Sequence, residues 1–200
     1  MGGFSKKKYK EMNSYDLICT AQSDDYDALE ELIKREQKNV YASFCYLGAN
    51  KECVSDLTQE ALFRMSKSIK ALKNPKMFKS WLGHIISNLF YDELRKKHKI
   101  PEALSIESFW TNDDENCELN ICDTKLTPDN KTLGKELTDL IKETICALPF
   151  NFRIVIILRE IQGLSYEEIA KITNTNVGTV KSRISRARNK MQEYLKPYLI

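Results

Sequence analysis

The sequence predicts an all-α protein. Only seven glycines and five prolines occur among the 200 residues, and tight β turns and phosphate-binding loops depend on these residue types. In addition, apolar residues recur at spacings of three and four along several long segments, which is the period of an amphipathic helix. These segments form two groups. We therefore expect two small helical domains joined by a linker.

Charge is distributed unevenly along the chain, although the net charge is only +3. Residues 64–99 contain ten basic and two acidic residues, residues 101–130 contain one basic and eight acidic residues, and residues 181–190 contain five basic residues and no acidic one. Local clusters of positive charge are typical of phosphate binding, but they also occur on solvated helix faces. The pattern favours two modules that face nucleic acid, separated by an acidic segment.

The acidic segment is interpreted as a flexible linker. It has no helical periodicity, and turn-forming residues cluster at 111–116 and 127–130. The predicted organisation is an N-terminal tail over residues 1–23, a helical domain over residues 24–100, the acidic linker over residues 101–131 and a second helical domain over residues 132–200.

Three amphipathic helices are expected in the first domain. The first covers residues 24–47, the second begins near residue 55, and the third follows a turn at residues 73–76. Four residues of the third helix share one face: His84, Asn88, Tyr91 and Arg95. A planar ring can stack on an unpaired base, an amide can bind its edge, and basic side chains can hold the backbone. This row is a candidate site for a single strand, and an ordinary amphipathic surface is the alternative.

The second predicted helix carries a large aromatic residue on its polar side. Phe63 shares that side with Asp56 and Glu60, and Gln59 lies beside them. A lone exposed aromatic residue usually means little, and packing on a neighbouring helix is an alternative. Because its neighbours can make charge-assisted hydrogen bonds, this face is a candidate site for a protein partner.

The second domain has the pattern of a helix-turn-helix. Ser165 and Glu168 form a capping box at the start of a short helix, and residues 174–176 separate it from a longer one. The apolar residues of the longer helix are Val177, Val180, Ile184, Ala187, Met191 and Tyr194. Hydrogen-bonding and basic residues occupy the remaining positions, as expected of a helix in the major groove. A surface helix with a solvated basic face is the alternative, and the capped helix before it favours DNA binding.

Several motifs resemble those of RNA polymerase sigma factors. The motifs similar to region 2 of this family are Asp56-Leu-Thr-Gln-Glu60, Phe78-Lys-Ser-Trp-Leu82, Asn88 and Asp92-Glu-Leu-Arg95. The motifs similar to region 4 are Leu148-Pro149, Leu164-Ser-Tyr-Glu-Glu-Ile-Ala170 and Gly178-Thr-Val-Lys-Ser-Arg-Ile-Ser-Arg-Ala-Arg188. With two domains and no recognisable domain between them, the chain resembles the extracytoplasmic-function type of the sigma-70 family over residues 24–196.

The resemblance implies three sets of functional residues. The set that matches the family's surface for the β′ clamp helices of the polymerase is Asp56, Gln59, Glu60 and Phe63. The set that matches capture of the minus-10 element is Lys73, Lys76, His84, Asn88, Tyr91 and Arg95. The set that matches the helix reading the minus-35 element is Thr179, Lys181, Ser182, Arg183, Ser185, Arg186, Arg188 and Asn189.

The resemblance also implies function and partners. A sigma factor binds bacterial core RNA polymerase, through the β′ clamp helices and the β flap, and directs it to promoter DNA. Region 4 reads the minus-35 element, and region 2 opens and captures the minus-10 element. Catalysis stays with the polymerase, so we expect no enzymatic activity and no cofactor. An anti-sigma factor is a further expected partner. The alternative is a DNA-binding regulator that uses residues 1–100 for dimerisation or effector sensing.

Other classes of protein are disfavoured by what the sequence lacks. The longest apolar runs, residues 44–49 and 154–158, are far shorter than the roughly 18 residues of a membrane span, and no secretory signal is visible. We therefore expect no membrane insertion and a cytoplasmic location. The six cysteines include no CxxC pair and there are two histidines, so neither a metal site nor disulfides are expected. No catalytic triad pattern or glycine-rich phosphate loop supports an enzyme.

Overall fold

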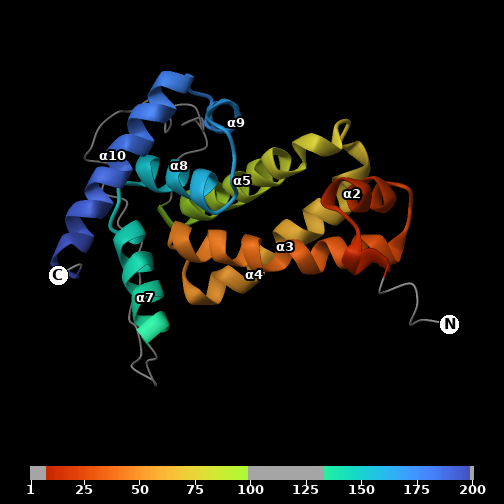
Figure 1. Cartoon of the computed structure of the whole chain (residues 1–200), viewed down its shortest axis with the longest axis horizontal. Coiled ribbons are helices and arrows are strands. Elements are labelled where there is room, and N and C mark those ends of the chain that lie inside the picture. Colours follow the sequence, from red (N-terminus) through yellow and green to blue (C-terminus); the bar gives the residue numbers. More distant parts are fainter. Residues whose placement is uncertain (1–7, 99–132, 199–200) are drawn as a thin grey trace.

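The structure is a computed structural model that describes residues 8–98 and 133–198 (Figure 1). Within these two ranges every regular element is an α-helix or a short 3-10 helix, which confirms the all-α prediction. We call residues 8–98 the N-terminal unit and residues 133–198 the C-terminal unit. The predicted acidic linker at residues 101–131 lies outside the described residues.

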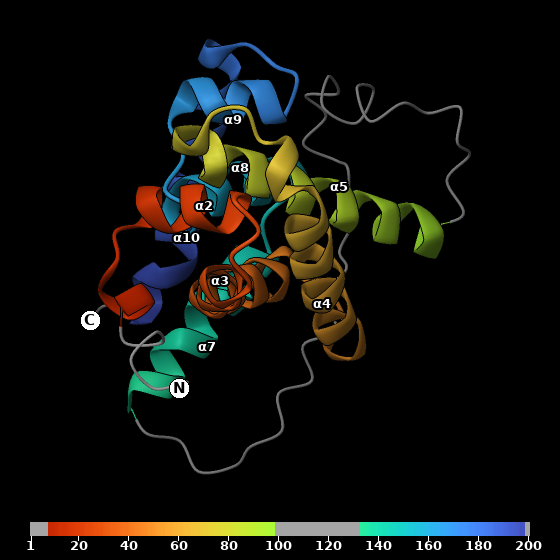
Figure 2. The ribbon, with the colours of Figure 1, turned by 90° about the vertical axis from the view of Figure 1, so that its right-hand side faces the viewer.

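Four helices make up most of the N-terminal unit: α2 (Ser14–Gln22), α3 (Tyr26–Leu47), α4 (Lys51–Ser68) and α5 (Phe78–His98). Asp25 caps α3 by accepting a hydrogen bond from the amide of Ala28, and Gly48 ends the helix with a φ of 87°. Two 3-10 turns, η1 (Ile69–Ala71) and η2 (Pro75–Met77), connect α4 to α5. The three helices predicted for this domain are present. Figure 2 shows the yellow connection between α4 and α5 next to the red helix α2.

Helix α2 corrects the prediction of an N-terminal tail over residues 1–23. Its Leu17, Ile18 and Ala21 are buried, and the helix packs along α3. A helix of nine residues is marginal in water on its own, so most of its stability comes from tertiary packing. The local sequence pattern does not report that packing, which is why the helix was not predicted.

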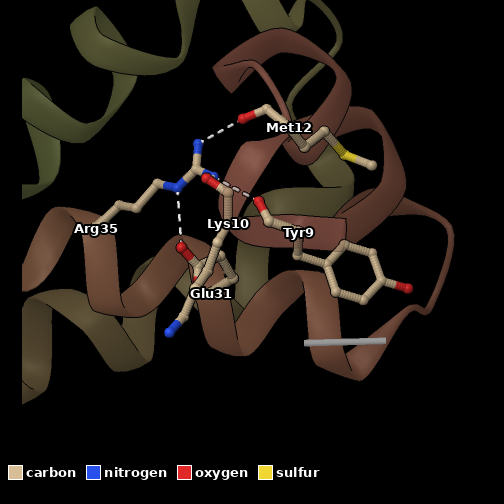
Figure 3. A network of polar contacts seen from close by, with 5 residues as sticks. All are labelled: Tyr9, Lys10, Met12, Glu31 and Arg35. Carbon is tan, nitrogen blue, oxygen red and sulfur yellow. Dashed lines mark hydrogen bonds and ion pairs between the residues drawn. The ribbon is translucent and has the colours of Figure 1, made fainter. Parts of the chain in front are cut away.

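Arg35 of α3 holds the turn that precedes α2 (Figure 3). Its guanidinium donates hydrogen bonds to the backbone carbonyls of Tyr9, Lys10 and Met12, the last at 2.8 Å. The same group pairs with Glu31, one turn earlier on α3, at 3.1 Å. A cation is a favourable donor to the carbonyls at the end of a helical turn, and the Tyr9 carbonyl also accepts a hydrogen bond from the amide of Met12 at 3.2 Å. The Tyr9 hydroxyl also donates a hydrogen bond to Asp25, the residue that caps α3, at 2.7 Å, so the chain before α2 is attached to α3 at two points.

The C-terminal unit consists of α7 (Leu133–Cys146), α8 (Phe150–Glu160), α9 (Tyr166–Ile172), α10 (Val177–Leu195) and the short turn η3 (Lys196–Tyr198). Figure 1 shows these helices beside one end of α3 and α5. Helix α3 contacts α7 and α8, and α5 contacts α9. The buried apolar side chains of both units form one continuous core.

Gly83 marks the close approach of α9 to α5. A Cβ atom at this position would lie 3.2 Å from Leu164 Cδ1 and 3.2 Å from Ile172 Cδ1. Glycine in the interior of a helix costs about 1 kcal/mol relative to alanine. Glycine at position 83 lets the side chains of Leu164 and Ile172 pack directly against the backbone of α5.

Candidate nucleic-acid interface

Helices α9 and α10 form the predicted helix-turn-helix. The predicted capping box is present: the amide of Glu168 donates to Ser165 Oγ, and the amide of Ser165 donates to the carboxylate of Glu168 at 2.8 Å. Asn174 in the turn has a positive φ of 46°, which asparagine tolerates better than most residues. Asn176 caps α10 by accepting a hydrogen bond from the amide of Thr179 at 2.7 Å. These local contacts set the direction in which α10 leaves the turn.

Most of the predicted minus-35 residues of α10 are exposed. The helix buries Val180, Ile184 and Ala187 and packs on α7, α8 and α9. Thr179 is half-buried. The exposed members of the set are Lys181, Ser182, Ser185, Arg186, Arg188 and Asn189. Hydroxyl and amide groups that can bind base edges thus lie among cations that can reach phosphates.

Arg183 is a correction to the predicted set, because its side chain is only 2% exposed. Residues spaced by three and four share one side of a helix, so position 183 lies with the buried Val180 and Ala187. The prediction followed the rule that arginine is rarely buried. Tyr194 differs in the opposite sense: it was assigned to the apolar stripe but is 51% exposed, because complete burial along α10 ends at Ala187.

Two cations near this face interact with their own unit. Arg188 donates a hydrogen bond to Glu160 at 2.6 Å, and this bond raises the pKa of Arg188. Lys181 Nζ lies 5.9 Å from the centroid of the Tyr166 ring, close enough for a cation–π contact. Arg186 is exposed on the same face and takes part in neither of these two contacts. It is therefore the cation of α10 best placed to reach DNA.

The predicted partner face of α4 is also exposed. Asp56 and Gln59 lie on it, and the Phe63 side chain is 59% exposed. This exposure rules out the alternative in which Phe63 packs on a neighbouring helix. Glu60 forms an ion pair with Arg64 at 2.6 Å. A groove of about 680 Å³ between α4 and α5 adjoins these carboxylates.

The predicted minus-10 residues do not form one exposed row. Lys73, Lys76 and Asn88 are exposed, whereas His84 and Arg95 are half-buried. Tyr91 is 4% exposed, which corrects the expectation of a surface ring. Its ring packs edge-on against Phe150 of α8 with the centroids 5.2 Å apart. Burial also lowers the pKa of His84.

Sequence reasoning did not single out the buried polar residues that join the two units. Arg153 of α8 is 1% exposed and donates hydrogen bonds to the carbonyl of Leu47 in α3, at 2.9 Å. It also donates to the carbonyls of Cys146 and Leu148, at the end of α7 and just beyond it. Gln162 donates to Ser43 Oγ of α3 at 2.6 Å. The available signal for Arg153 was an arginine within the apolar run at residues 152–158.

A second groove, of about 590 Å³, lies between α7, α8 and α10. Its apolar lining includes Ile141, Ile145, Ile156, Ile157, Ile161, Met191 and Leu195. Sequence analysis did not predict it. The signal was that apolar residues occupy seven of the eleven positions of α8, including every position from Ile154 to Leu158, more than one buried face requires. An apolar groove of this kind is typical of a binding site for an amphipathic helix.

Two further features concern residues 8–98 and 133–198, the parts of the chain that the structure describes. There, no group of three or more histidine, cysteine, aspartate or glutamate side chains is arranged to hold a metal ion. In the same residues, no helix has both the length and the apolar character needed to cross a membrane.

Comparison with known proteins matches both units to one family. The family model for Sigma-70 region 2 matches residues 32–100, and that for Sigma-70, region 4 matches residues 138–191. The ECF RNA polymerase sigma-E factor of Haemophilus influenzae is 32% identical over 185 residues, which cover 92% of this chain and 95% of the relative. The ECF RNA polymerase sigma-E factor of Escherichia coli K12 is 32% identical over 184 residues, covering 92% and 94%.

Two solved structures have similar folds. The sigma factor RpoE in complex with the anti-sigma factor NepR from Bartonella quintana has a TM-score of 0.64 and 26% identity, covering 84% of this chain and 96% of that chain. CnrH in complex with the cytosolic domain of CnrY has a TM-score of 0.62 and 20% identity, covering 92% and 97%. At that identity, CnrH supports the fold alone.

Proposed function

Because this chain belongs to the extracytoplasmic-function type of the sigma-70 family of RNA polymerase sigma factors, it acts in promoter-specific transcription initiation by RNA polymerase, and we propose how its surfaces divide this work. Helix α10 reads the minus-35 element. Helix α5 and the connection before it open and capture the minus-10 element. Helix α4 and the apolar groove of the C-terminal unit bind core polymerase, which catalyses the reaction.

The exposed face of α10 is the observation that carries the proposal. A capped short helix and a tight turn present this face as in other helix-turn-helix proteins, whose second helix enters the major groove. Ser182 and Ser185 can bind base edges, and Arg186 can bind either a guanine edge or a phosphate. The face thus combines groups that specify a sequence with groups that supply affinity.

The connection between α4 and α5 supports the minus-10 assignment. Lys73 and Lys76 are exposed there and can hold the backbone of a strand, and Asn88 is exposed further along α5. Flipping a base from the stack costs a few kcal/mol, and stacking with hydrogen bonding returns a similar amount. Because Tyr91 packs against Phe150, the C-terminal unit has to leave α5 before Tyr91 can stack on a base.

Two surfaces suit core polymerase. The acidic residues Asp56 and Glu60 beside the exposed Phe63 ring suit a basic helical partner, and we assign this face to the β′ clamp helices. The apolar groove between α7, α8 and α10 suits an amphipathic helix, and we assign it to the β flap. A similar protein, RpoE, forms a complex with an anti-sigma factor, and we include such an inhibitor among the partners of this chain.

The test is transcription with bacterial core polymerase and the purified chain on a library of genomic fragments. Sequencing of the transcript ends should show start sites that share two upstream motifs. Binding to core polymerase without any promoter-dependent transcript would overturn the proposal.

A variant pair separates the proposal from the alternative of a DNA-binding regulator. Reversal of charge in Asp56→Arg with Glu60→Arg should weaken core binding by at least about tenfold, because like charges across an interface repel. Glu30→Arg, at an exposed acidic position of α3, is the matched control and should bind normally. If the double variant retains binding and transcription, the regulator becomes the better explanation.

A further inference from the structure

Helix α2 lies outside the segment that matches Sigma-70 region 2, which begins at residue 32, yet it contacts the connection between α4 and α5. Both turns of that connection, η1 and η2, pack against α2, and Figures 1 and 2 show the red helix beside the yellow connection. The contact joins the N-terminal end of the described chain to the segment to which the proposed function assigns minus-10 capture.

Gln22 at the end of α2 makes the contact specific. Its side-chain amide donates two hydrogen bonds, to the carbonyl of Ile69 at 2.9 Å and to the carbonyl of Leu72 at 2.7 Å. These acceptors lie 47 and 50 residues further along the chain. They lie where α4 and η1 end, and the Ile69 carbonyl also accepts a hydrogen bond from the amide of Leu72 at 3.1 Å. Leu72 then turns to extended geometry, with a ψ of 102°.

The residues on either side of these bonds are also held. Asp24 forms an ion pair with Lys70 of η1, and it does so from a backbone with a φ of 65°, which few residues other than glycine adopt readily. Beyond Leu72, the Asn74 side chain accepts a hydrogen bond from the amide of Lys76. The lysine-bearing connection is therefore fixed at its start by α2 and within itself by Asn74.

Helix α2 is firmly attached and can act as a support. Asn13 caps its start by accepting a hydrogen bond from the amide of Asp16 at 2.9 Å. Its apolar residues are buried against the rest of the N-terminal unit, and Arg35 holds the preceding turn to α3 (Figure 3). The support thus extends from α3 through α2 to the connection.

We propose that Gln22 is a positioning residue for DNA capture: through the carbonyls of Ile69 and Leu72 it fixes the connection at residues 73–77 so that Lys73 and Lys76 face the melted strand. This inference rests on the proposed function of that connection. By this inference, α2 is a structural part of the minus-10 site. A role in stability alone is the competing explanation.

The test compares Gln22→Met, which keeps the size of the side chain but has no donor, with Gln37→Met, the same change at an exposed position of α3. The probe is the labelled non-template strand of the first promoter identified with wild-type holoenzyme. We expect Gln22→Met holoenzyme to bind this strand about tenfold more weakly, because two hydrogen bonds are lost. Affinity for core polymerase and for a minus-35 duplex should stay unchanged, and Gln37→Met should match the wild type.

A double-variant cycle separates positioning from stability. Lys76→Ala should lower affinity for the strand in the wild type and have much less effect in the Gln22→Met background, because the lysine is already misplaced there. Hydrogen exchange over residues 69–77 should be faster in Gln22→Met. Gln22→His keeps one N–H donor and gives an intermediate loss; it also serves if Gln22→Met does not fold.

The outcomes distinguish this inference from the proposed function. If Gln22→Met holoenzyme binds the strand as well as wild-type holoenzyme does, the role of Gln22 is overturned and the proposed function stands. Additive effects of Gln22→Met and Lys76→Ala, or unchanged exchange over residues 69–77, would do the same. Wild-type holoenzyme that binds no promoter strand would overturn the proposed function and the inference with it.

Discussion

Helices α10 and α5 both carry residues predicted to contact DNA, but they differ in how those residues are covered. Helix α10 buries one side within its own unit and presents Ser182, Ser185 and Arg186 to solvent. Helix α5 is covered on one side by its own unit and in part by the C-terminal unit, which buries Tyr91 against Phe150. The two faces therefore differ in what must happen before they can bind.

This difference agrees with the two forms of DNA in the proposed function. A face that reads an intact duplex can be exposed at all times, whereas a face for a melted strand is required only once the duplex has opened. The Phe150 ring and the close contact at Gly83 cover α5, and the hydrogen bonds of Arg153 and Gln162 hold the same unit to α3. Changes at these positions test the comparison directly.

The largest effect is expected from Arg153→Met, which removes the buried cation between α3 and α8. The carbonyl of Leu47 and two carbonyls at the end of α7 and just beyond it lose their donor. We expect the free energy of unfolding to fall by about 3 kcal/mol, because buried acceptors are left without partners. Urea unfolding measures the loss. Arg64→Met, at an exposed ion pair with Glu60, is the control; an equal loss in both variants would contradict the role of Arg153.

The next effect concerns α10 and compares an exposed with a buried arginine. If Arg186 reads a guanine edge, Arg186→Ala should weaken promoter binding by about 1–3 kcal/mol, and the loss should be confined to one base position. If Arg186 binds a phosphate, the variant should instead lower the slope of log affinity against log salt concentration by about 1. Arg183→Ala should instead lower stability, since its side chain is buried. Binding titrations at several salt concentrations and urea unfolding measure both. If Arg183→Ala were as stable as Arg186→Ala and lost the same promoter affinity, Arg183 would contact DNA and the prediction would be wrong.

A wedge at Gly83 should separate the units by steric means. Gly83→Leu places a large side chain where even a Cβ atom would lie 3.2 Å from Leu164 and Ile172, and overpacking of this kind costs about 1–2 kcal/mol. Helix α5 itself gains from the loss of glycine. We therefore expect an increased radius of gyration by solution scattering, with Tyr91 more accessible. Gly83→Ala needs only a small shift of two side-chain ends and should stay compact; an unchanged radius for Gly83→Leu would refute the wedge.

The smallest effect is a pH dependence of stability that originates on α5. Burial lowers the pKa of His84 from an ordinary value of about 6.5, so the folded protein binds fewer protons than the unfolded chain. The free energy of unfolding should therefore fall as the pH drops through that ordinary value toward the lowered one. His84→Gln removes this pH dependence, so on acidification the wild type should lose stability relative to the variant. Parallel profiles between about pH 7.5 and pH 5 would exclude it.

The local features of the C-terminal unit could be predicted from sequence because they depend on neighbouring residues. The capping box at Ser165 and Glu168 is confirmed with both of its hydrogen bonds, and the stripe through Val180, Ile184 and Ala187 is buried as expected. Charges and helix periodicity also located the exposed face of α10. The assignments of Asp56 and Gln59 to polymerase, and of Lys73 to the minus-10 strand, stay predictions.

Other features depend on residues far apart in the chain. Helix α2 forms by packing on α3. Tyr91 is buried by Phe150, which belongs to the other unit, and Arg183 is buried although its charge argued for exposure. Sequence patterns report how each helix divides into polar and apolar faces. They do not report which polar face another helix will cover.

By itself, the sequence determined the long amphipathic helices, the capping box at Ser165 and Glu168, the two basic modules and the motifs that identify the family, because each depends on spacing within one segment. The tertiary structure alone decided that the face of α5 is partly covered, that Arg153 joins the units and that Gln22 supports the connection before α5. The physical reason is that these contacts form between segments far apart in the chain. They depend on close packing of complementary surfaces and on hydrogen bonds that offset the hydration lost by buried polar groups.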